Sequence, residues 1–229
     1  MLSIWLAALF WLALHLLVAG PLRRGLAARL GERVFFGLFS LLSIVGLVCL
    51  VFAYRAAPFV PLWPTAPAAG YVALSLVLVA FMLIVFGGGR RNPTATRADR
   101  CLAGRLPVHG ITRVTRHPRL SGVALWAMAH LLVNGHLAAL LLFGAILVSA
   151  LNGMVSIDRK RRLALGAAAW DDFAAQTSRL PFVAILAGRN RLELGELAVW
   201  QFVLAVGLFA GVFWLHGVLG LSPMLAFET

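Results

Sequence analysis

Two histidines lie inside apolar runs of the sequence, where a charged or polar side chain is costly. His15 falls within residues 2–19, and His130 falls near the end of residues 120–133. An ionisable side chain inside a membrane segment is therefore a candidate functional residue by default. Two neutral imidazoles that face each other across a helix bundle can hold a haem iron. The alternative is that each imidazole only donates a hydrogen bond to a neighbouring helix.

The positions of the two histidines permit a shared iron without requiring one. His15 is five residues from Gly20 and His130 is twelve from Pro118, so at about 1.5 Å per residue their depths differ by roughly 10 Å. If the helix that carries His130 begins after Gly122, the difference falls to about 5 Å, which helix tilt can absorb. A metal site formed by His15 and His130 is therefore allowed, and the hydrogen-bonding alternative stays open.

A second candidate site is the basic segment that precedes the run containing His130. Arg116-His117-Pro118 lies there, with Arg113 and Arg119 nearby, and proline is well tolerated at the start of a helix. Arg116 and His117 would then form an anion site for a haem propionate, a nucleotide-like cofactor or a lipid phosphate. Alternatively, the segment is a solvated loop that only sets membrane topology.

Composition places these residues in a membrane protein. Of the 229 residues, 62% are hydrophobic and only 12% are charged, and several apolar runs approach the length that spans a bilayer. The net charge of +12 does not indicate nucleic-acid binding, because the basic residues lie in short loops between apolar runs. We therefore expect an all-α, polytopic helical bundle in contact with the lipid bilayer.

The distribution of basic residues predicts the topology. Of the 20 Lys and Arg residues, 19 fall in three loops and only Arg55 falls on the other side. Under the positive-inside rule this bias predicts a bacterial inner-membrane protein with both termini in the periplasm. We expect six spans at about residues 2–19, 34–54, 71–89, 120–133, 137–157 and 197–219.

The last basic loop contains an alanine-rich stretch that is predicted to be helical. Trp170 and Phe173 lie in it beside Arg and Lys residues. Aromatic side chains beside basic ones are typical of a helix that lies on a membrane surface. We expect this helix on the inner surface.

Several motifs of the chain resemble those of the NnrU family. They are G-I-T-R-V-T-R-H-P from Gly110 to Pro118, L-W-A-x-A-H ending at His130, I-D-R-K, and T-S-x-x-P-F-x-A-I-x-x-G-R. The resemblance runs from about His15 to Arg191 and is consistent with one NnrU-type transmembrane domain over residues 1–229. Bacterial members of this family are associated with nitrite and nitric oxide reduction. Plant and cyanobacterial relatives are zeta-carotene isomerases, which are integral membrane enzymes with haem b.

The resemblance implies a haem b protein that serves denitrification, as a redox or isomerase-like enzyme beside a nitrogen-oxide reductase system. The isomerases have a site similar to a bis-histidine haem, and its histidines fall here on His15 and His130. The isomerase has a cysteine three residues before its second histidine, where this chain has Ala127. The sulfur ligand proposed for ligand exchange in the isomerases, and hence for carotene isomerisation, is thus absent at this position.

Two other functions remain open at this point. The region more distantly resembles isoprenylcysteine-type methyltransferases, which have an R-H-P-x-Y-x-G motif followed by a Glu-rich helix that helps to bind S-adenosylmethionine. Here the tyrosine position holds Leu120, and the acidic pair of that helix is missing, because Ile157-Asp158 stands in its place. The third alternative is an assembly factor for a reductase, without catalysis of its own.

Overall fold

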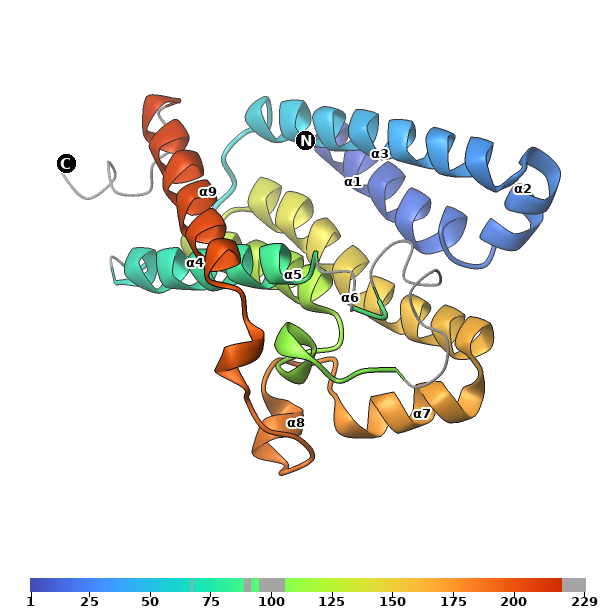
Figure 1. Ribbon diagram of the computed structural model, residues 1–229. Helices are drawn as coiled ribbons and strands as arrows, with labels where there is room; N and C mark the ends of the chain where they lie inside the picture. Colours follow the sequence, from blue (N-terminus) through green and yellow to red (C-terminus); the bar gives the residue numbers. More distant parts are fainter. Residues whose placement is uncertain (67, 89–91, 95–105, 220–229) are drawn as a thin grey trace.

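The computed structural model describes residues 1–66, 68–88, 92–94 and 106–219, and most of these residues are helical (Figure 1). They form no β-strand, and their one isolated bridge joins Pro61 to His136. The elements are α1 (Leu2–Leu12), η1 (Ala13–Val18), α2 (Arg23–Leu30), α3 (Glu32–Arg55), α4 (Ala69–Phe86), η3 (Gly110–Arg113), α5 (Pro118–Val133), α6 (Leu137–Leu165), α7 (Ala167–Gln176), α8 (Val183–Leu186), η4 (Leu194–Glu196) and α9 (Val199–Val218).

The predicted all-α membrane fold is confirmed, but the count of six spans is not. Within the described residues α3, α4, α6 and α9 are long and apolar enough to cross a membrane. A fifth span results if the α1–η1 segment and α2, which meet at 78°, count as one broken crossing. α5 has only 16 residues, or about 24 Å at 1.5 Å per residue, which is short of the ~30 Å hydrocarbon layer.

The first helix changes from α-helix to π-helix at its C-terminal end. After Leu12 it continues as a π-helix, η1, which contains His15. Lys160 Nζ of α6 then donates a hydrogen bond of 2.7 Å to the carbonyl of Ala19, satisfying one acceptor where the chain turns into α2. Insertions of π-helix are rare and occur frequently at functional sites.

α5 lies between α4 and α6, and small residues allow the close approach. Gly122 of α5 faces Ala80 of α4 so closely that an added Cβ would stand 2.7 Å from the Ala80 carbonyl oxygen. Ala127 and Ala129 are fully buried in the same helix. Small residues serve this purpose in membrane bundles because they let backbones pack together. α1 and α3 pack with α6, as Figure 1 shows.

The turn between α5 and α6 is covered by the loop that follows α3. The backbone N–H groups of Leu62 and Trp63 both donate to the carbonyl of Gly135. A Cβ at Gly135 would collide with the Trp63 carbonyl, so the turn dipeptide Asn134-Gly135 requires its glycine. This contact closes the end of the bundle at which α5 ends and α6 begins.

The helix predicted around Trp170 exists as α7, but its aromatic residues do not face outward. Trp170 and Phe173 are buried and pack with Leu106. They therefore cannot be the membrane anchors that their sequence suggested. The solvent-facing side of α7 carries Asp171 and Asp172 instead.

Candidate functional site

His15 is held in one tautomer by its own helix. Its Nδ1 lies 3.0 Å from the carbonyl oxygen of Trp11, and that oxygen can only accept a hydrogen bond. Nδ1 therefore carries the proton, and Nε2 keeps its lone pair. The ring stacks on Trp11 with centroids 4.0 Å apart, and Phe39 of α3 meets it edge-on at 5.4 Å.

His130 repeats this arrangement on α5. Its Nδ1 donates to the Trp126 carbonyl at 2.8 Å, and its ring lies 4.4 Å from the Trp126 ring and 4.7 Å from Phe143 of α6. Both histidines thus stand in a Trp-x-x-x-His turn with an unprotonated Nε2. His216 of α9 also donates from Nδ1 to the carbonyl four residues earlier, but Val212 replaces the tryptophan.

The structure does not bring His15 and His130 to one level of the bundle. The ring of His130 contacts Phe143, whereas Trp11, on which His15 stacks, donates from Nε1 to Ser149 Oγ at 3.1 Å. Phe143 and Ser149 are six residues apart on α6, which corresponds to about 9 Å along the axis and about 120° around it.

The direction of the helices does not reduce this separation. α1 and α6 run in the same direction. Trp11 forms a hydrogen bond with Ser149, and Ala19, later in the first segment, forms one with Lys160, later in α6. His15 therefore lies at the level of Ser149 or beyond it. The helix of His130 also begins at Pro118 rather than after Gly122, so the larger of the two offsets expected from the sequence applies.

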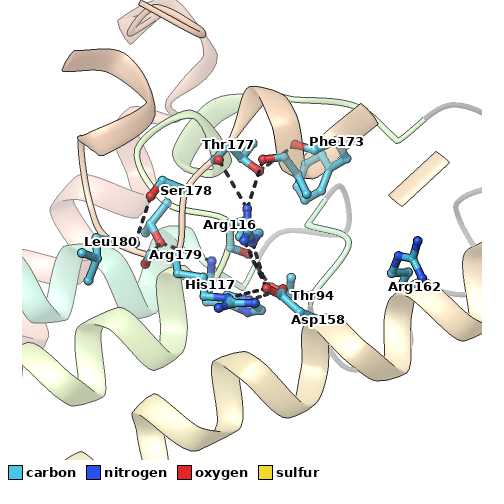
Figure 2. Close-up of polar contacts among 12 residues, drawn as sticks. Thr94, Arg116, His117, Asp158, Arg162, Phe173, Thr177, Ser178, Arg179 and Leu180 are labelled. Carbon is cyan, nitrogen blue, oxygen red and sulfur yellow. Dashed lines mark hydrogen bonds and ion pairs between the residues drawn. The ribbon is translucent and has the colours of Figure 1, made fainter. Parts of the chain in front are cut away.

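At the second predicted site, the anion that the basic residues contact is a carboxylate of the protein (Figure 2). Arg116 and His117 both bind the carboxylate of Asp158 on α6, and Arg179 completes the cluster. The distances to the Asp158 oxygens are 3.1 Å from Arg116 Nη2, 2.6 Å from His117 Nε2 and 2.6 Å from Arg179 Nε. The anion at the start of α5 is therefore part of the protein.

The remaining donors of Arg116 are also occupied. Its Nη1 donates to the carbonyls of Ala174 and Thr177, which end α7. Arg119 lies apart from this cluster, against Gly87 and Gly88 at the end of α4. This separation of Arg119 from Arg116 agrees with a helix that begins at Pro118.

His117 is buried and has one free ring nitrogen. Since Asp158 accepts the hydrogen bond from Nε2, Nδ1 carries a lone pair, and it has no hydrogen-bond partner. Burial lowers the pKa of His117 below its ordinary value, although the nearby Asp158 carboxylate acts in the opposite direction. The anion that this imidazole contacts is the carboxylate of Asp158.

Arg113 belongs to a separate pair. Its guanidinium binds both carboxylate oxygens of Glu196, at 2.7 and 2.8 Å, and the Gly110 N–H donates to the same carboxylate. The hydrogen bonds from Arg113 lower the pKa of Glu196 to about 2. The pair ties η3 to the segment that leads into α9.

Comparison of the sequence with known proteins identifies its family. The family model described as "NnrU protein" matches residues 3–223. The chain belongs to the NnrU family. Two curated relatives are chloroplastic 15-cis-zeta-carotene isomerases: 36% identity over 83 residues for the Zea mays protein, and 30% over 113 residues for that of Arabidopsis thaliana.

The similarity to the isomerases is partial in length. The matched parts cover 36% and 47% of this NnrU protein, but only 22% and 30% of the two isomerases. No solved structure matches the chain.

Sequence reasoning missed Asp158, Arg179 and Glu196. Asp158 is the only acidic residue within α6, and such an isolated acid at the end of an apolar run was a usable signal. Arg179 and Glu196 offered none, because their partners lie 21 and 83 residues away in the chain. In this NnrU protein, the Arg179–Asp158 and Arg113–Glu196 ion pairs attach the basic loops to the helix bundle.

Proposed function

We propose that this NnrU protein is an isomerase-like integral membrane protein that binds haem b and serves nitrite and nitric oxide metabolism. His15 and His130 are the residues that would hold its iron. The observation that carries the proposal is the repeated Trp-x-x-x-His turn, in which Nδ1 is bonded to a backbone carbonyl and Nε2 is left with its lone pair. Metal-binding histidines almost always donate their other N–H to such a partner.

Each imidazole presents an unprotonated nitrogen that can hold a metal ion. Phe143 and Ser149, the α6 residues that mark the two positions, lie about 9 Å apart along the helix axis. Ligation of one iron by both histidines therefore requires the two imidazoles to lie closer in depth than these two residues of α6.

The protein's own residues have defined roles in this proposal. Trp11 and Trp126 fix the orientation of the two imidazoles by stacking on them. Ala127 is fully buried three residues before His130 and offers no sulfur ligand at that position. Bound haem would supply one-electron redox chemistry.

The site around Arg116 and His117 gives no support to the methyltransferase alternative. Both side chains are committed to Asp158, and the free nitrogen of His117 is a buried acceptor. To bind here, the carboxylate of a methyl donor would have to displace the carboxylate of Asp158. We therefore rank haem binding above S-adenosylmethionine binding.

The test is the haem content and visible spectrum of the purified, full-length protein, oxidised and reduced. We expect haem b in the wild type, and loss of the low-spin spectrum in both His15→Ala and His130→Ala. His216→Ala is the matched control, since His216 has the same bond to its own helix without the tryptophan, and it should retain the spectrum. Absence of haem from the wild type, or unchanged spectra in both variants, would refute the proposal.

A further inference from the structure

A group of large apolar side chains faces outward around α8, at the end of the bundle that carries the basic loops. We call it the apolar tip; it consists of Leu180, Phe182, Val183 and Leu186, which are 60%, 47%, 40% and 84% exposed. Contiguous apolar groups of this kind on a protein surface usually mark a contact with a membrane or a partner. The tip is separate from both histidine sites.

The backbone of the apolar tip is held in place. The N–H of Phe182 donates to the carbonyl of Val114 at 2.9 Å, and Ala184 is fully buried beneath the turn. Phe182 has a φ of 65°, a left-handed conformation that is costly for a phenylalanine. Such a conformation persists only where the surroundings impose it, so the outward position of the tip is a fixed feature of the fold.

The chain segment that carries the apolar tip is basic. Arg179, Arg189 and Arg191 flank the tip and residues 178–192 contain no acidic residue, but Arg179 pairs with Asp158 and Arg191 with Glu193. Arg189 is held by hydrogen bonds to the carbonyls at the end of α7. Apolar side chains rimmed by arginines complement a bilayer with anionic headgroups.

The exposed apolar surface continues along the chain into a membrane span. Leu194, Val199 and Trp200 are 69%, 77% and 65% exposed, and they lead into the lipid-facing surface of α9. α7 differs, because its outward side carries Asp171 and Asp172. Of these two segments at the end of the bundle with the basic loops, the apolar tip rather than α7 has a surface that can contact lipid.

We propose that the apolar tip inserts into the interface of an anionic phospholipid bilayer, with its arginines at the headgroups, and so anchors the segment between α7 and α9 to the membrane. This replaces the contact that Trp170 and Phe173 were expected to make. The proposal is independent of haem binding.

The test uses the full-length protein reconstituted in phosphatidylglycerol-containing vesicles, with Cys49 and Cys101 replaced by alanine. An environment-sensitive fluorophore is attached to Leu186→Cys or, separately, to Val183→Cys. Ala168→Cys, on the outward side of α7, is the matched control. Nitroxide-labelled lipids with shallow and deep quenching groups report the depth of each label.

We expect blue-shifted emission and quenching by the shallow nitroxide at both tip positions, with water-like, unquenched emission at Ala168→Cys. Raising the phosphatidylglycerol fraction should strengthen the tip signals. Water-like emission without quenching at both tip positions would overturn the proposal, as would quenching equal to that of the control.

Discussion

Replacing Asp158 with asparagine should destabilise the protein strongly, because one carboxylate serves three donors in the loop cluster. The side chains of Asp158, Arg116 and His117 are only 7%, 11% and 0% exposed. An asparagine of the same size keeps the volume but leaves the Arg116 charge buried without a counter-charge. Removing one partner of a buried ion pair costs about 3–5 kcal/mol of unfolding free energy. The side chain of Arg179 is 45% exposed, so water screens much of the stabilisation from its ion pair with Asp158.

The assay is equilibrium unfolding of the purified protein in mixed detergent micelles, followed by circular dichroism. Asp171→Asn is the control, since Asp171 pairs with Arg162 on the surface with side chains 53% and 52% exposed, and it should change little. Arg116→Met combined with Asp158→Leu should recover only part of the loss. It removes the buried Arg116 charge, but His117 Nε2 and Arg179 still lose their acceptor. A loss within about 1 kcal/mol for Asp158→Asn, the range of exposed pairs, would refute the reasoning.

Other consequences of the structure can be measured in the same way. Since the folded-state pKa of Glu196 is about 2, below the ordinary 4.5, its contribution to stability is complete above pH 4.5 and is lost as the pH falls towards 2. Glu196→Gln should remove this acid-dependent part from a pH titration of unfolding; an unchanged titration would contradict the pairing with Arg113. The pKa of His117 is also lowered, so protonation of the unfolded chain should reduce stability as the pH falls below 6.5. His117→Gln should weaken that phase but leave the part due to His136, whose pKa burial also lowers. Gly122→Leu should cost about 1–3 kcal/mol or more by overpacking against α4, whereas the open position Gly207→Leu should be tolerated.

Local patterns predicted the elements of the fold well. Apolar length indicated the spans, Pro118 indicated where α5 begins, and Asn134-Gly135 indicated the turn before α6. These features depend on residues close together in the chain. The count of six spans was less secure, because it required α5 to cross the bilayer with 16 residues.

The candidate sites were harder to predict, because they depend on which distant segments pack together. The basic residues around His117 suggested an external anion, whereas the folded chain supplies Asp158 from 41 residues further on. Trp170 and Phe173 suggested a membrane anchor, yet Leu106 packs with them from a segment more than 60 residues away. The histidine pair was predicted from its position in apolar runs and from the family resemblance, and it stays a prediction. The separation of the two histidines in depth depends on where α1 and α5 lie along α6.

The most direct test of the proposed function is low-temperature electron paramagnetic resonance of the oxidised, full-length protein. If both Trp-x-x-x-His turns supply Nε2 to one iron, the wild type should show a low-spin signal typical of two imidazole ligands, and either single histidine variant should convert it to high spin. A wild-type spectrum without low-spin haem iron would contradict the account.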